Sequence, residues 1–140
     1  MVWTLEQRER DSVASTSNES RYQYFLIRAA DWSEVWTLRM DGQYLLLGVN
    51  GERESVPVWP HRDYAVLACR DDWCGAEPVS ISLDVWLDRW IPGIAKDSRL
   101  ICVFPVPTND MGRPYSGQVV GPGTLREDLL RELQEIEGIE

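Results

Sequence analysis

The sequence predicts a single α+β domain, with helices packed on a mostly antiparallel sheet of about four to five strands. Helical and strand-like patterns follow one another in the order α-β-β-β-α-α-β-β-α, without a repeat or an interdomain linker. The length of 140 residues is that of one ordinary domain. A composition of 44% hydrophobic and 26% charged residues is typical of a globular chain rather than a disordered one.

We expect the domain at residues 18–140, after a flexible polar N-terminal extension at residues 1–17. The extension mixes Glu, Arg, Ser, Thr and Asn and has almost no apolar periodicity. The first helix follows it, because apolar residues then recur at the spacing that gathers side chains on one helix face. These residues are Tyr22, Phe25, Leu26, Ala29 and Ala30. Asn18 or Ser20 is the expected N-cap of this helix.

Two turn signals divide the next stretch into strands. Asp41-Gly42 and Asn50-Gly51 are pairs that adopt the positive backbone angles of tight hairpin turns, and the runs around them are rich in Val, Leu, Trp and Tyr. This pattern predicts a three-strand antiparallel meander. Pro57 lies in the third run and cannot donate a ladder hydrogen bond, which indicates an edge strand.

Two helices are predicted in the middle of the chain. Residues 60–70 suit a short helix with Pro60 in its first turn, where a missing N–H costs least. The next helix has Ser82 as a candidate N-cap and Pro92-Gly93 as a stop signal. Its apolar residues stand at helical offsets; they are Leu83, Trp86, Leu87, Trp90 and Ile91.

Residues 99–106, RLICVFPV, form a nearly continuous apolar run of strand length. Such a run favours a central strand buried on both faces. Pro105 and Pro107 are expected to end its regular pairing. Residues 108–118 are expected to contain a loop, after which residues 118–120 return as a short strand.

The chain is predicted to close with a helix that starts at a capping box. In this motif Thr124 would be the N-cap and Glu127 would reach back to it. The apolar stripe of the helix consists of Leu125, Leu129, Leu133 and Ile136.

Residues 56–75, VPVWPHRDYAVLACRDDWCG, hold the only histidine and two of the three cysteines. Histidine and cysteine together could form a Cys–His nucleophile or a zinc site. A zinc site with four ligands would require Cys102, which lies in the predicted buried strand. Buried cysteines usually behave as small hydrophobic residues. We therefore predict reduced packing cysteines, no metal, no cofactor and no catalytic residue. His61 is expected to be a surface or capping residue near a helix N-terminus.

The triplet Asp71-Asp72-Trp73 has two interpretations. An exposed aromatic side chain beside acids is typical of a protein-binding surface. Alternatively, the acids form a solvated turn and the Trp73 ring folds back into the core. The seven tryptophans of the chain likewise favour the core, with a Trp-lined ligand groove as the alternative.

The charge of the chain bears on its partners. Twenty-three acidic and 14 basic residues leave a formal net charge of −9. Nucleic acid and anionic membranes are polyanions that such a surface repels, so they are poor candidate partners, and a basic protein is a better one. No apolar run approaches the ~20 residues that a membrane span needs, and the N-terminus does not resemble a signal peptide. These features predict a cytoplasmic protein.

Four segments of the chain resemble a bacterial family catalogued as domain of unknown function 2750. They are YFLIRAADWSEVW (24–36), VPVWPHRDYA (56–65), ISLDVWLDRWIPGIAKD (81–97) and VFPVP (103–107). The resemblance implies a small bacterial α+β domain, and it supplies no established activity or catalytic residues. The polar N-terminal extension and the longer loop at 108–118 depart from the family pattern.

These observations lead to three functional hypotheses. The first is a non-enzymatic acidic domain that binds a basic protein, such as a cytoplasmic immunity protein that neutralises a toxin; its candidate contacts are Asp71, Asp72, Trp73, Glu132 and Glu135. The second is a small enzyme or ligand-binding domain that uses a Trp-lined pocket near His61. The third is a regulatory or scaffold protein. The sequence leaves the identity of the partner and the oligomeric state open.

Overall fold

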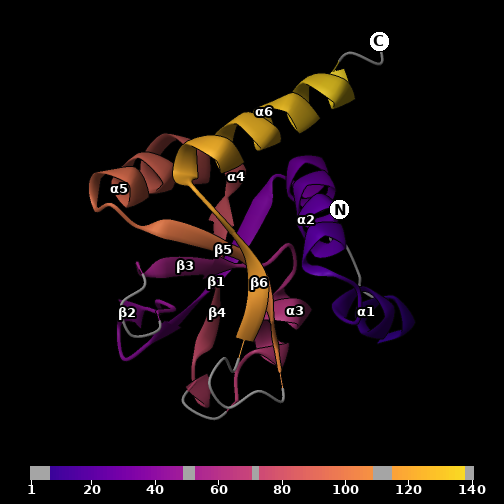
Figure 1. Ribbon diagram of the computed structural model, residues 1–140, viewed down its shortest axis with the longest axis vertical. Helices are drawn as coiled ribbons and strands as arrows, with labels where there is room; N and C mark the ends of the chain where they lie inside the picture. The colour runs from indigo at the N-terminus through magenta and orange to yellow at the C-terminus, as the bar shows by residue number, and fades with distance from the viewer. Residues whose placement is uncertain (1–6, 49–52, 71–72, 109–114, 138–140) are drawn as a thin grey trace.

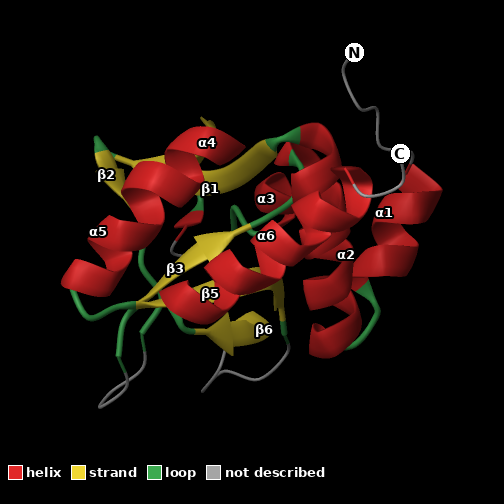
Figure 2. Ribbon diagram, turned by 90° about the horizontal axis from the view of Figure 1, so that it is seen from above, coloured by secondary structure: helices red, strands yellow, loops and turns green. Residues whose placement is uncertain are grey.

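The computed structural model describes residues 7–48, 53–70, 73–108 and 115–137 (Figure 1). It has helices and six strands, which confirms the predicted α+β class. The strands form two three-stranded sheets, in the orders β2-β1-β4 and β3-β5-β6, instead of one sheet. Helices α4, α5 and α6 lie over one end of the sheets, and α1 and α2 lie at one side (Figures 1 and 2).

The first sheet is built on a hairpin that the sequence predicted. Strands β1 (Glu34–Met40) and β2 (Gln43–Tyr44) are antiparallel, and the turn residues Asp41 and Gly42 have φ of 54° and 79°. Both angles are those of a type I′ turn, which matches the twist of the flanking strands. Strand β4 (Glu77–Ser82) pairs with β1 along its whole length. We did not predict β4, because its glutamate, proline and serines give a weak strand signal.

The second sheet corrects most of the predicted meander. Strand β3 (Ser55–Val58) keeps only one antiparallel bridge to the preceding run, in which Ser55 and Leu47 exchange two backbone hydrogen bonds. It otherwise pairs in parallel with β5 (Leu100–Pro107), while β6 (Tyr115–Val120) pairs antiparallel with β5 on its other side. All four residues of β3 are buried, as is usual for a strand in parallel pairing. The predicted turn at residues 50 and 51 lies outside the described residues.

The sequence made two predictions from prolines in the second sheet, one for the position of β3 and one for the pairing of β5. Strand β3 is an edge strand, as Pro57 indicated. Regular pairing of β5 with β6 is interrupted between Val103 and Val106, around Pro105, and the strand ends at Pro107, but β5 pairs with β6 again at Val106 and Pro107 before it ends. Phe104 lies inside this irregularity with φ of 56°, and the irregularity accommodates the missing N–H of Pro105. Strand β6 is accordingly longer than the three residues expected.

The two sheets join at Trp59, directly after β3. Its backbone exchanges two hydrogen bonds with Trp36 of β1, with N···O distances of 2.9 and 2.8 Å. The Trp59 indole Nε1 donates to the carbonyl of Pro105 in β5 at 2.9 Å. Thr37 Oγ1 adds a hydrogen bond to the carbonyl of Pro57 at 2.7 Å. Trp59 is therefore the structural joint between the two sheets.

The N-terminal extension contains helix α1 (Gln7–Ala14), where the sequence predicted a flexible segment. Helix α2 (Asn18–Trp32) follows, with Ser17 as its N-cap instead of Asn18 or Ser20. The Ser17 Oγ accepts a hydrogen bond from the Ser20 backbone N–H at 3.1 Å. The predicted apolar face of α2 is buried, and it packs on β5, β6 and α6.

Of the two middle helices, only the second begins where the sequence predicted, and neither ends where it predicted. Helix α3 (Arg62–Leu67) has His61 as N-cap, so Pro60 precedes the helix, and the helix ends before Arg70. Ser82 caps α4 (Leu83–Val85), as predicted. The chain then continues through a π-helical turn, η2 (Trp86–Trp90), into α5 (Ile91–Lys96).

Pro92-Gly93 therefore does not stop the helix. The π-helical turn explains this difference: the N–H of Ile91 bonds to the carbonyl of Trp86, five residues earlier. A proline within a helix clashes with the carbonyl four residues before it, and a local π-bulge displaces that carbonyl.

The last helix, α6 (Pro122–Glu137), starts two residues before the predicted cap. Its first turn is closed by a bond from the Leu125 N–H to the Gly121 carbonyl, so Thr124 lies inside the helix and the predicted capping box is wrong. Proline suits this first position because its φ is already helical. Leu125 and Leu129 are fully buried, whereas Ile136 is 45% exposed near the C-terminal end. None of the helices in the described ranges is long and apolar enough to span a membrane.

Candidate functional site

Trp73, one of the predicted partner contacts, faces the core. It is only 8% exposed, stacks on the Tyr115 ring at a centroid distance of 4.5 Å and meets Trp59 edge-on at 6.4 Å. The Trp73 ring therefore cannot be the exposed aromatic contact that the binding hypothesis requires. The alternative interpretation, in which the ring folds back, describes its position. Asp71 and Asp72 lie outside the described residues.

Glu132 and Glu135, the other predicted contacts, lie on the C-terminal half of α6. Glu135 is exposed and Glu132 is partly buried. Burial raises the pKa of Glu132, the neighbouring charge of Glu135 raises it further, and Arg131 opposes both effects. The two carboxylates thus repel each other on one surface of the helix.

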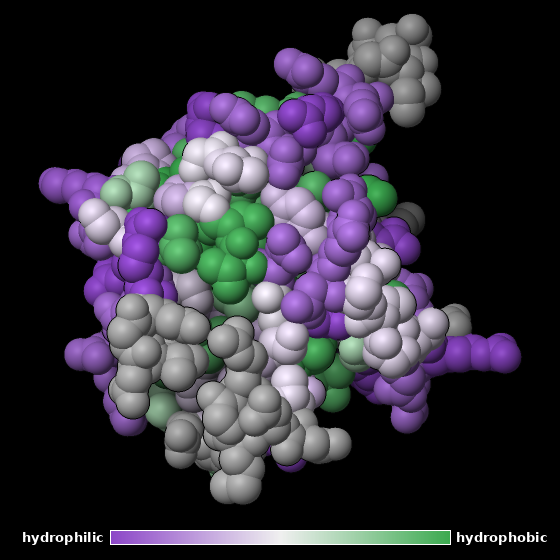
Figure 3. Space-filling view, viewed as in Figure 1, coloured by the Kyte–Doolittle hydropathy of each residue, from purple (hydrophilic) through white to green (hydrophobic). Residues whose placement is uncertain are grey.

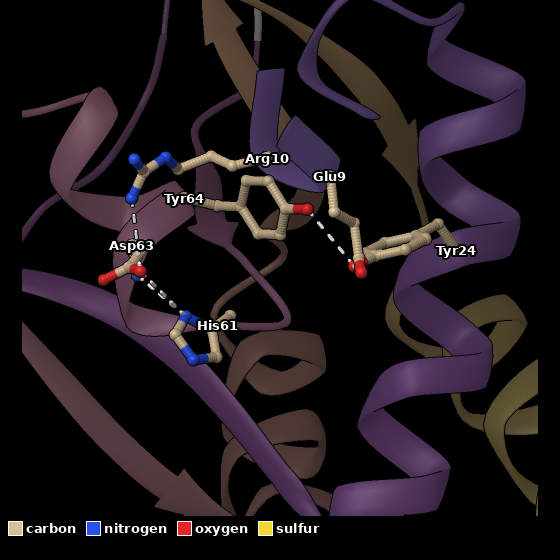
Figure 4. A network of polar contacts seen from close by, with 6 residues as sticks. All are labelled: Glu9, Arg10, Tyr24, His61, Asp63 and Tyr64. Carbon is tan, nitrogen blue, oxygen red and sulfur yellow. Dashed lines mark hydrogen bonds and ion pairs between the residues drawn. The ribbon is translucent and has the colours of Figure 1, made fainter. Parts of the chain in front are cut away.

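His61 and Asp63 form the start of helix α3, at the centre of a polar network (Figure 4). The His61 Nδ1 accepts a hydrogen bond from the Asp63 backbone N–H at 3.0 Å and lies 3.9 Å from an Asp63 carboxylate oxygen. Arg10 of α1 donates to that same oxygen at 3.3 Å. The lone pair of Nδ1 is engaged in capping the helix, which agrees with the capping role that the sequence predicted.

The other half of the network holds helix α1 against α2. The Tyr24 hydroxyl donates to a Glu9 carboxylate oxygen and accepts from the Tyr64 hydroxyl at 3.2 Å. Arg28 also lies 3.6 Å from that Glu9 oxygen. Burial raises the pKa of Tyr24, as does its hydrogen bond to Glu9, and burial raises the pKa of Tyr64 to about 12. Both tyrosines therefore stay protonated at neutral pH and act as donors.

We expect replacing Glu9 by Gln to release α1 while leaving the rest of the domain folded. Helix α1 has no fully buried residue and only the partly buried Val13 packs on the core, so its attachment depends largely on these polar contacts, and partly exposed ion pairs contribute only about 0 to 1 kcal/mol each. Hydrogen–deuterium exchange should accelerate at residues 7–14, with a change below about 1 kcal/mol in the free energy of unfolding.

Asp11→Asn is the matched control, because Asp11 is exposed on the same helix and forms no ion pair with any residue in the described ranges. Equal exchange at residues 7–14 in both variants would show that Glu9 does not anchor α1.

Cys69 and Cys102 have the character of packing residues. Burial raises the pKa of Cys102 to about 12, and it also raises the pKa of Cys69. Both thiols are thus held in their protonated, unreactive form. Cys74 is exposed. Among the residues that the structure describes, no three His, Cys, Asp or Glu side chains gather into a possible metal site.

An open groove of about 410 Å³ lies between α5 and the strands β2 and β3. Trp90 forms part of it, but His61 does not, so the Trp-lined groove lies away from the position that the sequence suggested. Its lining residues are Tyr44, Leu46, Val56, Arg89, Trp90, Gly93, Ile94, Asp97 and Arg99. We missed Tyr44 and both arginines because three separate segments bring them together. The helical spacing of Trp86 and Trp90 was the only signal in the sequence that pointed to this region.

Comparison with known protein families gives one match. The model of a family described as "Protein of unknown function (DUF2750)" covers residues 22–129. This span begins after α1 and includes every residue that lines the groove. A search of the curated proteins found no match.

Proposed function

The chain belongs to the DUF2750 family, whose description names no function, and we propose that this member is a non-enzymatic domain that binds a basic protein. The observation that carries the proposal is the concentration of negative charge on the C-terminal helix. Helix α6, residues 122–137, contains five acids and two bases, so it supplies −3 of the net charge of −9. The acids are Glu127, Asp128, Glu132, Glu135 and Glu137.

The placement of α6 supports a role in recognition. Leu125 and Leu129 anchor its first half, while its second half extends past α2 at the edge of the molecule (Figure 1). Mostly hydrophilic side chains cover this part of the surface (Figure 3). Asp128 is engaged by Arg131 at 3.2 Å and by the Tyr22 hydroxyl, whereas Glu127 and Glu135 form no ion pair with any described residue. These free carboxylates are available to cations of a partner.

The electrostatics of Glu132 and Glu135 favour the same class of partner. Burial first and the charge of Glu135 second raise the pKa of Glu132, and a lysine or arginine brought close by a partner would offset both costs of its negative charge. An acidic surface also accelerates association with a basic protein by electrostatic steering. An immunity protein that neutralises a basic toxin in the cytoplasm is the specific form of this proposal. A regulatory or scaffold protein would use the surface in the same way with another partner.

The test is affinity capture with the full-length chain from lysate of its native cell, followed by association kinetics with the purified captured protein. We expect Glu132→Lys/Glu135→Lys to lower the association rate about tenfold at low salt, because steering scales with the charge that faces the partner. High salt should bring the rates of the wild type and the variant together.

The matched control is Asp84→Lys/Asp88→Lys, which changes the net charge by the same amount on exposed residues of α4 and η2. Equal rates for both double variants would show that overall charge, and not α6, governs association. The proposal fails if the chain retains no basic protein at low salt, or if the α6 variant binds as fast as the wild type.

A further inference from the structure

The groove between α5 and the strands β2 and β3 has the size and the lining of a small-molecule site. Its volume of about 410 Å³ falls within the roughly 300 to 1,000 Å³ that ligand pockets occupy. Leu46, Val56 and Ile94 give it apolar walls. Arg89, Asp97 and Arg99 supply a few polar groups at its margin. Such a combination fixes the orientation of a ligand while burying its apolar body.

Two aromatic side chains, with their rings nearly perpendicular, make one wall of the groove. Tyr44 is 43% exposed, and its ring meets the Trp90 ring edge-on, with centroids 4.7 Å apart. Trp90 stacks on the fully buried Trp86, and their ring centroids are 5.8 Å apart. An aromatic pair of this kind presents a rigid apolar surface that loses little entropy when a ligand binds.

The π-helical turn places Arg89 and Trp90 on this wall. Both belong to η2, the five-residue turn between α4 and α5. The extra residue in the turn lets Trp86 enter the core while Arg89 and Trp90 line the groove. Single π-helical turns are rare and occur frequently at functional sites. The backbone irregularity therefore lies at the groove and supplies two of its lining residues.

The arginines determine which ligands the groove favours. Arg89 is exposed and forms no ion pair with any residue that the structure describes. Arg99 pairs through its two terminal nitrogens with Asp97 at 3.2 Å and Glu54 at 3.5 Å, but its Nε is buried without a hydrogen-bond partner among the described residues. Asp97 and Glu54 already pair with Arg99, so Arg89 is the lining cation that has no carboxylate partner among the described residues. A ligand with one negative charge would balance Arg89.

We propose that the groove binds a small monocarboxylate with an aromatic or branched aliphatic body. The carboxylate pairs with Arg89, which is free to form the bidentate geometry that guanidinium and carboxylate groups prefer. The apolar body lies against Trp90 and Tyr44. A carboxylate beside Arg99 would also accept a hydrogen bond from the Arg99 Nε after a small shift of the Arg99 side chain. This site is separate from the acidic surface of α6 and does not depend on the protein-binding function proposed above.

The probe for the test is 3-phenylpropionate, titrated into the full-length protein and followed by two-dimensional ¹H–¹⁵N NMR. We expect saturable shifts at the Trp90 indole N–H and the Gly93 amide, with a dissociation constant at or below about 1 mM. The neutral analogue 3-phenylpropionamide should bind at least about tenfold more weakly, since it cannot pair with Arg89. Acetate should also bind at least about tenfold more weakly, since it has no body to bury.

Arg89→Gln should weaken 3-phenylpropionate binding about tenfold without changing the fold, because Arg89 is exposed and makes no described ion pair. The matched control is Arg126→Gln, which removes an exposed arginine of α6 outside the groove. The proposal is overturned by the absence of saturable shifts at Trp90 and Gly93, by equal affinity for the amide, or by an Arg89→Gln variant that binds like the wild type. Each of these results leaves the α6 proposal unaffected.

Discussion

Replacing Trp59 by Ala should destabilise the fold by about 3 to 5 kcal/mol, the cost of truncating a large buried aromatic side chain. Trp59 has 0% exposure, and its indole fills the joint at which the two sheets meet. The substitution also leaves the Pro105 carbonyl without its donor. Because small domains have only about 5 to 15 kcal/mol of net stability, this single change removes a large part of it.

Urea unfolding followed by circular dichroism measures the effect, and we expect the midpoint to fall by about 2 M. Trp59→Phe separates the two causes, since it keeps most of the packing and loses only the indole hydrogen bond; it should cost less than half as much. Val66→Ala is the control, because Val66 is 41% exposed on the neighbouring helix α3. A Trp59→Ala variant no less stable than Val66→Ala would contradict the role of Trp59 as the joint.

Replacing Arg21 by Met should destabilise the protein by about 3 kcal/mol, because buried carbonyls that lose a charged donor cost about 1 to 3 kcal/mol each. Arg21 is 3% exposed at the start of α2. Its Nε donates to the Phe104 carbonyl at 3.2 Å and its Nη2 to the Ser116 carbonyl at 3.1 Å. Phe104 lies inside the irregular pairing of β5 and β6 and Ser116 lies at its end, so Arg21 supplies donors where the strands do not pair regularly.

The same guanidinium binds the Thr16 carbonyl and the Asn18 side chain, so it also fixes the start of α2. Burial lowers the pKa of Arg21, which shows the cost of keeping this cation inside the protein. Arg21→Lys tests the geometry, since an ammonium group retains the charge but cannot span four acceptors; we expect most of the loss to remain. Arg126→Met, an exposed arginine on α6, should change the free energy of unfolding by less than about 0.5 kcal/mol. Thermal unfolding in which Arg21→Met and Arg126→Met behave alike would refute this account.

The site was less predictable than the fold, and Trp73 illustrates the reason. The sequence shows an aromatic residue beside two acids, and that pattern is equally compatible with a surface ring and a buried one. Its side chain is buried because Tyr115 and Trp59 approach it from segments more than ten residues away. The groove was hidden for the same reason, since Tyr44, Arg89 and Arg99 come from separate parts of the chain.

Some local features were fixed by short stretches of sequence alone. Asp41-Gly42 forms the predicted hairpin because few residue pairs adopt two positive φ angles easily, and Ser82 caps a helix with its own hydroxyl. The edge position that Pro57 indicated and the burial of residues 101–105 likewise follow from backbone chemistry and continuous hydrophobicity. The net charge is also a property of the sequence.

Long-range contacts decided the remaining features. Strand β4 exists because β1 offers it a complete set of hydrogen-bond partners. Strand β3 keeps one bridge of the predicted meander and pairs along its length with β5, where it is buried entirely. The helix continues past Pro92 because a π-helical turn removes the clash that would otherwise stop it. A local pattern reports only the preferences of neighbouring residues, whereas pairing, burial and the shape of a groove depend on free energies shared between segments that meet only in the folded chain.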